Sequence, residues 1–83
     1  LSLNRALKTA QTLVKNGEYS AEKIKKVMWD MISREPHTRI DYISVCDAKT
    51  FTDREEVSGK ALIALAVHVG RARLIDNCIV EKV

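Results

Sequence analysis

The sequence predicts an α+β domain in which a helical hairpin packs on one face of a three-stranded antiparallel sheet. Three observations lead to this fold. Apolar residues recur at helical spacing from position 3 to position 32. After Pro36 the spacing changes to two, which is the period of a strand. Gly70-Arg71 then separates two apolar runs, as the turn of a β-hairpin does. The predicted element order is α-α-β-β-β.

The first half of the chain predicts two helices joined by a short loop. The apolar stripe of the first helix consists of Leu3, Ala6, Leu7, Ala10, Leu13 and Val14. Asn16-Gly17 ends this helix, because glycine tolerates the left-handed conformation that follows a helix. Ser20 caps the second helix, and Pro36 ends it. The second stripe consists of Ile24, Val27, Met28, Met31 and Ile32.

The second half predicts three strands. Thr38 to Cys46 is rich in β-branched and aromatic residues. Asp47 then caps a turn, and Thr52 to Gly59 forms a charged loop. Lys60 to Val69 is almost entirely apolar, so a helix and a strand both fit its length. The hairpin turn that follows favours a strand, which we place in the middle of the sheet. Ala72 to Val80 forms the third strand.

A two-residue turn fixes the register of the last two strands. It places Val67 opposite Leu74, Leu65 opposite Asp76 and Ile63 opposite Cys78. The other face of the sheet then carries Leu62, Ala64, Ala66 and His68 beside Ile79, Asn77, Ile75 and Arg73. A slip of one residue would exchange the two sets. Two helices cover only one face, so the second face must be covered by loops, by a partner or by the rest of a longer protein.

Composition bounds the function of the chain. Its 83 residues make one domain, and its net charge of +3 is spread along the sequence. We therefore expect no nucleic-acid binding, which needs a basic patch interleaved with aromatic residues. The absence of an 18-residue apolar run or a signal peptide argues against a membrane or secreted protein. Two cysteines fit reduced thiols in a cytoplasmic protein. The start at Leu1 suggests a fragment of something larger.

The residues predict no catalytic, substrate-binding or metal site. The two cysteines and two histidines have no metal-ligand spacing. A disulfide is not expected, because Cys46 and Cys78 lie on the two outer strands, about 9–10 Å apart. The structural or interface candidates are Arg73, Asp76, Asn77 and Trp29.

Two interpretations of these candidates remain open. Asp76 and Asn77 interrupt an apolar strand. One interpretation is a pair that binds a ligand or forms an interface. The other, which we favour, is a buried pair that satisfies backbone groups or Arg73. Trp29 lies off the main helical stripe, which makes it a candidate for contact with another domain.

Four segments, in order, resemble the C-terminal domain of the pantothenate synthetase family, also called pantoate–β-alanine ligase. The most specific is Gly70 to Asn77, the end of a run that begins at Ala61. The others are Leu1–Leu7, which resembles an LSRAL-type helix but differs at Asn4, then Val14–Glu18, and Arg39–Tyr42 with Val45 and Asp47. Together they cover nearly the whole chain.

The resemblance implies a two-domain ligase whose Rossmann-like N-terminal domain is absent here. That domain uses ATP, Mg²⁺ and pantoate to make pantoyl-adenylate, which β-alanine attacks to give pantothenate and AMP. This chain would be the lid, bind no cofactor alone and be inactive alone. The family's nucleotide-binding motifs do not occur in the sequence, so no catalytic residue is assigned. The resemblance also places Ser2 inside a helix. The alternative is a non-catalytic module that self-associates or binds another protein through its open sheet face.

Overall fold

A computed structural model describes residues 3–83 and contains two helices followed by three strands. The helices are α1 (Leu3–Lys15) and α2 (Ala21–Ser33). The strands are β1 (Thr38–Asp47), β2 (Lys60–Val69) and β3 (Ala72–Glu81). The predicted α+β order is therefore confirmed. The expectation that Ser2 lies inside a helix falls outside the described residues.

The helices bury most of the stripes that their sequences predict, but Leu13 and Met31 are only half-buried and Val27 is exposed. In α1 the buried residues are Leu3, Ala6, Leu7, Ala10 and Val14. In α2 they are Ala21, Ile24, Met28 and Ile32. Val27, which we placed in the stripe, is instead 36% exposed, because it lies beside the buried row and not within it. The Ser20 side chain accepts a hydrogen bond from the Lys23 backbone N–H at 3.3 Å, which confirms the predicted cap.

The sheet is antiparallel with β2 in the centre, as predicted. The register of β2 and β3 is also confirmed, since Val67 lies opposite Leu74 and Ile63 opposite Cys78. The turn between them contains Gly70 at φ 57°, a left-handed conformation that suits glycine. The pairing of β1 with β2 shifts between Ile40 and Tyr42, where a bulge adds one residue.

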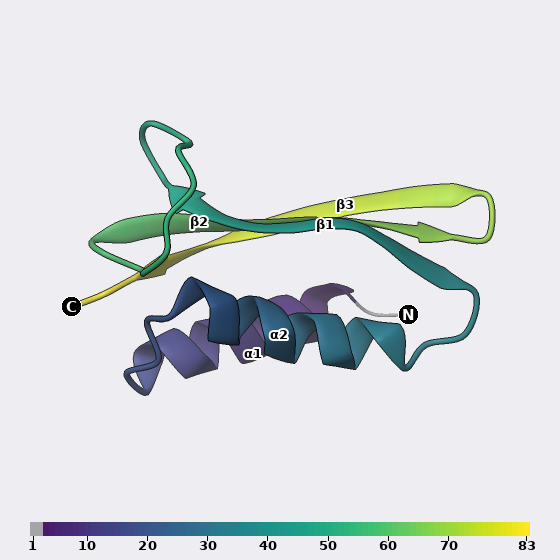
Figure 1. Cartoon of the computed structure of the whole chain (residues 1–83), viewed down its shortest axis with the longest axis horizontal. Coiled ribbons are helices and arrows are strands. Elements are labelled where there is room, and N and C mark those ends of the chain that lie inside the picture. The colour runs from purple at the N-terminus through teal and green to yellow at the C-terminus, as the bar shows by residue number, and fades with distance from the viewer. Residues whose placement is uncertain (1–2) are drawn as a thin grey trace.

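Both helices lie on the same side of the sheet, so the molecule has two layers (Figure 1). The core lies between these layers, and its sheet residues include Val45, Ile63, Leu65, Val67 and Val80. Neither helix of residues 3–83 lies on the opposite side of the sheet. We call this side the open face, and it holds the alternate residues of each strand.

The loop of residues 48–59 joins β1 to β2 and contacts both layers. Its first part rises on the side of the sheet away from the helices (Figure 1), where Asp53 pairs with Cys46. Its second part returns to α2, where the Ala21 backbone N–H donates to the Glu55 carbonyl at 2.9 Å. Val57 is only 1% exposed and belongs to the core. The charged composition of this segment predicts a solvent-exposed loop and gives no sign of this core residue.

Candidate functional site

The Lys60–Glu81 pair of β2 and β3 lies at the loop end of the open face. Four further rows of side chains run across all three strands. From the β2–β3 hairpin toward the loop of residues 48–59 they are Arg39–His68–Arg73, Tyr42–Ala66–Ile75, Ser44–Ala64–Asn77 and Cys46–Leu62–Ile79. The first row is basic, the second and fourth are mainly apolar, and the third is small and polar. We call them the basic row, the two apolar rows and the polar row.

The apolar rows are most accessible to solvent on β3. Ile75 is 58% exposed and Ile79 is 50% exposed, and both lie on β3. At the β1 end, Tyr42 is 39% exposed, whereas Cys46 is buried near the Cys46–Asp53 bridge. The loop of residues 48–59 therefore covers one corner of the face and leaves the β3 side uncovered.

An ion cluster joins the three strands at the hairpin end of the open face. Arg73 donates from Nε and Nη2 to Oδ2 of Asp41 at 3.1 and 2.8 Å. His68 Nε2 lies 3.9 Å from the same oxygen. The hydrogen bonds from Arg73 hold the pKa of Asp41 below its ordinary value. The bulge in β1 supplies Asp41 as its extra residue, so a local irregularity positions the cluster.

Sequence reasoning missed Asp41 as a partner for Arg73. The available signal was a carboxylate inside an otherwise β-branched and aromatic run, at Ile40-Asp41-Tyr42. A strand without a bulge would place Asp41 on the face opposite Tyr42, away from Arg73. Predicting the pair therefore required predicting the bulge.

The structure corrects the expected burial of Asp76 and Asn77. Asp76 is half-buried and Asn77 is exposed, because β3 is an edge strand. Asp76 does satisfy a backbone group, since its Oδ1 accepts the N–H of Asn77 at 2.8 Å. Arg73 pairs with Asp41 and not with Asp76. Arg73 and Asn77 thus share the open face, while Asp76 lies on the face that the helices cover, opposite Leu65.

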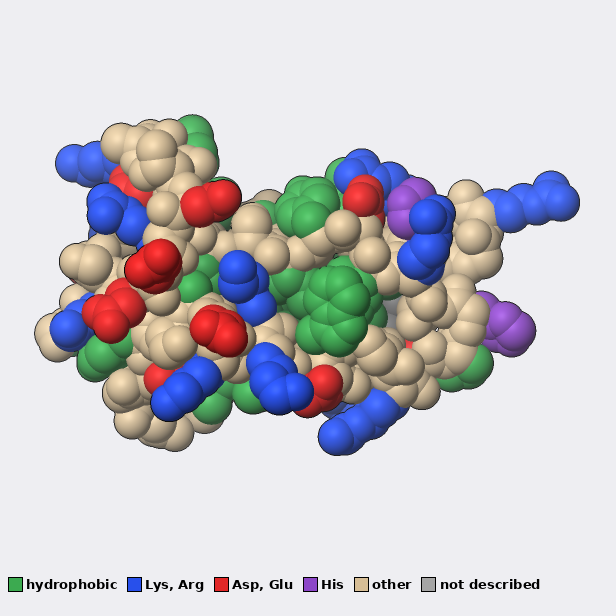
Figure 2. Space-filling view, viewed as in Figure 1, with side chains coloured by type: hydrophobic (Ala, Val, Ile, Leu, Met, Phe, Trp, Pro, Cys, Tyr) green, Lys and Arg blue, Asp and Glu red, His purple; other side chains and the backbone are tan. Residues whose placement is uncertain are grey.

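Trp29 lies apart from these three residues. It is 48% exposed on α2 and borders a hollow of about 400 Å³ together with Lys25, Lys26 and Ile43. Figure 2 shows apolar side chains gathered in the middle of this side of the molecule, with charged side chains around them. The structure therefore does not bring Trp29 and the β3 candidates into one site.

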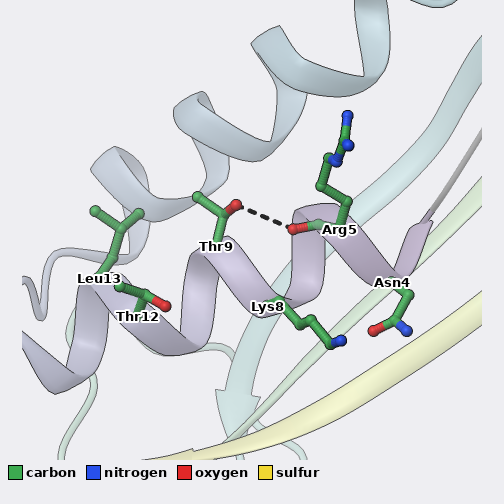
Figure 3. A pocket seen from close by; sticks show the side chains of 6 residues that line it. All are labelled: Asn4, Arg5, Lys8, Thr9, Thr12 and Leu13. Atoms are coloured by element: carbon green, nitrogen blue, oxygen red, sulfur yellow. Dashed lines mark hydrogen bonds between the residues drawn. The ribbon is translucent and has the colours of Figure 1, made fainter.

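A second hollow, of about 490 Å³, runs along the outer side of α1 (Figure 3). Its lining includes two cations and two hydroxyls, from Arg5, Lys8, Thr9 and Thr12. The hydroxyl of Thr9 is used within the helix, because it donates to the Arg5 carbonyl at 3.0 Å. One helix supplies the whole lining, so the hollow lacks the convergent groups of a built ligand site.

Within residues 3–83, no group of three His, Cys, Asp or Glu side chains is placed to hold a metal ion. Both cysteines are free thiols. Burial is the main cause that raises the pKa of Cys46, and it raises the pKa of Cys78 to about 11. Neither of the two helices between positions 3 and 83 is long and apolar enough to span a membrane.

The fold and the open face define a class of protein: a small two-layer α+β domain with one covered and one uncovered sheet face. Comparison with known proteins gives the family. Residues 1–79 match the family model described as pantoate-beta-alanine ligase. The chain therefore belongs to the pantoate–β-alanine ligase family.

Individual relatives support this assignment. The chain is 51% identical over 79 residues to the pantothenate synthetase of Caldicellulosiruptor saccharolyticus, which covers 95% of this chain and 28% of the relative. It is 46% identical over 81 residues to the pantothenate synthetase of Moorella thermoacetica. This match covers 98% of the chain and 29% of that relative. The crystal structure of pantothenate synthetase from Thermus thermophilus superposes with a TM-score of 0.81 at 25% identity, over 92% of this chain and 27% of that one.

The matched shares locate the chain within the family. It spans less than a third of the length of these relatives, and it corresponds to their C-terminal domain. The resemblance seen in the sequence is thus confirmed for family and domain.

Proposed function

We propose that this chain is the lid of a two-domain, AMP-forming ligase that joins pantoate to β-alanine. In this proposal a Rossmann-like N-terminal domain of the same polypeptide binds ATP and pantoate. The pantoate carboxylate attacks the α-phosphate of ATP, which forms pantoyl-adenylate and releases pyrophosphate. β-Alanine then attacks the adenylate, which gives pantothenate and AMP. Closure of the lid excludes water, which would otherwise hydrolyse the reactive acyl-adenylate.

The observation that carries the proposal is the coverage of the relatives. Almost the whole chain matches, at 95%, yet it accounts for 28% of the relative named pantothenate synthetase. The proposal therefore assigns Mg²⁺, the nucleotide and all catalytic groups to the rest of the ligase. It places the ligase in the cytoplasm, where two free thiols remain reduced.

A chimera tests the lid role. The Caldicellulosiruptor saccharolyticus enzyme is truncated before the segment that matches this chain, and the chain is fused in its place. With ATP and pantoate but no β-alanine, the truncated enzyme should release AMP by adenylate hydrolysis. The chimera should suppress this release about 10-fold or more and restore pantothenate formation when β-alanine is added. A truncated enzyme that remains as tightly coupled as the whole enzyme would contradict the lid role.

The isolated chain tests the second part of the proposal. Incubated with ATP, Mg²⁺, pantoate and β-alanine, it should release no AMP above a blank without protein. AMP release that requires all three substrates would show that the chain carries a complete active site. Circular dichroism of the same sample confirms that the chain is folded, so inactivity cannot be attributed to unfolding.

A further inference from the structure

Phe51 is held in a backbone conformation that suits glycine better than phenylalanine. Its φ is 59°, in the left-handed region where a Cβ meets steric resistance. The hydrogen bonds of the loop tip impose this conformation. The Phe51 N–H donates to the Asp47 carbonyl at 2.9 Å, and the Asp47 N–H donates to the Thr52 carbonyl at 2.9 Å. The tip is therefore a rigid turn that carries a strained aromatic residue.

The Phe51 side chain is also left largely in solvent. It is 67% exposed, and Ile75 and Ile79 of β3, at 58% and 50%, are the next most exposed large apolar side chains between positions 3 and 82. All three belong to the side of the sheet away from the helices. The part of the loop that contains Phe51 rises there (Figure 1), and both isoleucines lie on the open face. Exposed apolar side chains gathered on one side indicate a surface that contacts another body.

Most of the ligase polypeptide lies outside this chain and can supply that body. The match covers 95% of the chain but 28% of the Caldicellulosiruptor saccharolyticus enzyme, so nearly three quarters of that enzyme lies outside it. The helical layer offers less apolar surface for contact. Every exposed residue of α1 is polar or charged, and α2 exposes only Val27 and Trp29 among its apolar residues.

We propose that Phe51 and the open face form the surface through which this chain closes on the N-terminal domain of the same ligase. Phe51 enters an apolar pocket of that domain, and the apolar rows of the open face lie against the surface around the pocket. The inference rests on the proposed function and identifies the docking surface of the lid. It gives Phe51 a role that accounts for both its strain and its exposure.

The place of Phe51 in the fold suits a contact that holds a lid closed. α1 runs from the hairpin end of the sheet toward the loop end (Figure 1), because Cys78 Sγ lies 4.0 Å from the Leu7 carbonyl oxygen, whereas Lys15 lines a hollow with Glu81. An N-terminal domain that precedes α1 thus joins the chain toward the hairpin end, far from Phe51. A contact far from a hinge restrains rotation about that hinge more than a contact beside it.

The size of the surface suits a contact that opens and closes. Three strands of ten residues, about 4.8 Å apart, present roughly 500 Å² in projection. Contacts between domains of one chain bury about 600–1,500 Å² and resemble transient protein interfaces. In such interfaces a few anchors, often aromatic, supply most of the binding energy. We therefore expect Phe51 to contribute a large share of the closing energy.

The Phe51→Gly variant tests the inference, because it should favour folding and oppose closure. In the isolated chain it should raise Tm by about 2 °C or more, since glycine adopts the left-handed conformation readily. In the chimera described above it should raise AMP release without β-alanine at least about 5-fold, since the closed state loses its anchor. A Tm that does not rise, or AMP release that stays suppressed, would overturn the proposed role of Phe51.

His37→Gly is the matched control for Phe51→Gly. His37 has a φ of 63° and is exposed, and its carbonyl accepts the Gly70 N–H at 3.1 Å at the hairpin end of the sheet. The control should raise Tm in the same way and leave AMP release by the chimera unchanged. An equal rise in AMP release with His37→Gly would contradict a specific role for Phe51.

Ile79→Lys tests the open face in the same chimera. It should raise AMP release at least about 5-fold, because closure would bury its charge. Leu74→Lys is the control, since Leu74 is also on β3, is 39% exposed and belongs to the face that the helices cover. Circular dichroism confirms that both variants fold. Suppression of AMP release by Ile79→Lys, or its loss with Leu74→Lys alone, would contradict docking through the open face.

These measurements separate the inference from the proposed function. A truncated enzyme that is as tightly coupled as the whole enzyme would remove the lid role itself. A wild-type chimera that suppresses AMP release, together with a Phe51→Gly or Ile79→Lys chimera that suppresses it equally, would overturn the docking surface and leave the lid role intact.

Discussion

The two faces of β2 come from one strand and have different surroundings. Ile63, Leu65 and Val67 point toward the helices and are fully buried. Leu62 and Ala64 alternate with them on the open face and are partly exposed. The apolar run of β2 thus exceeds what the two helices cover. This difference teaches that a continuous apolar strand indicates two covered faces without showing which part of a protein, or which copy, covers each one.

The largest expected effect comes from truncating a leucine on each face in turn. Leu65→Ala should lower the free energy of unfolding by about 3 kcal/mol, because it leaves a cavity in the core. Leu62→Ala should lower it by only about 1 kcal/mol, because the side chain is partly exposed already. Urea denaturation measures both. Equal losses would show that the open face is packed within a single copy.

Cysteine labelling compares the faces by chemical reactivity. Burial raises the pKa of Cys78, on the covered face, from 9.0 to about 11. The shift lowers its thiolate fraction at pH 8 roughly 100-fold, and the thiolate is the reactive form. Labelling of Cys78 by a disulfide reagent at pH 8 should therefore be slow in the folded chain and fast in urea. The Cys46→Ala variant isolates the Cys78 signal, and fast labelling of this variant while folded would contradict the predicted burial.

The smallest expected effect on stability comes from Asp47, which holds the start of the loop that covers one corner of the open face. Asp47 accepts the backbone N–H groups of Lys49 and Thr50 at 2.8 and 3.0 Å and pairs with Arg54 at 3.1 Å. These bonds lower the pKa of Asp47 from 3.8 to about 2. The unfolded chain binds this proton more tightly, so the contribution is present above pH 4 and is lost as the pH falls toward 2.

The Asp47→Asn variant isolates this contribution. It should be less stable than the wild type at pH 6, and the difference should shrink as the pH falls from 4 to 2. Thermal unfolding at several pH values measures the difference. A constant difference over that range would show that the carboxylate charge has no part in holding the loop.

Sequence patterns predicted most of the fold because the decisive signals are local. The helical period, the Ser20 cap and the Gly70-Arg71 turn each act within a few residues. The turn alone fixed which residues of β2 and β3 oppose each other. Val57 was missed because one valine among charged neighbours has no period. Its place in the core involves residues far away in the sequence, such as Tyr19, whose carbonyl accepts the Val57 N–H at 2.7 Å.

The candidate residues were harder to predict than the fold. The sequence placed Arg73 and Asn77 on the open face correctly, since strand alternation determines the face. It did not predict the partner of Arg73, because a bulge on another strand positions Asp41. The burial of Asp76 was overestimated because β3 is an edge strand. The position of a strand in its sheet cannot be read from the local sequence.

The two parts of the loop differ in how much change in chain length they can absorb. Phe51, near the tip, is 67% exposed, and the tip's neighbours are bonded mainly to one another. Extra residues inserted there would extend into solvent and leave both layers undisturbed. Insertion between Glu55 and Val57 would instead pull a core side chain out of place. An affinity tag, a reporter peptide or a fluorophore site can thus be added at the tip of this loop without disturbing the fold.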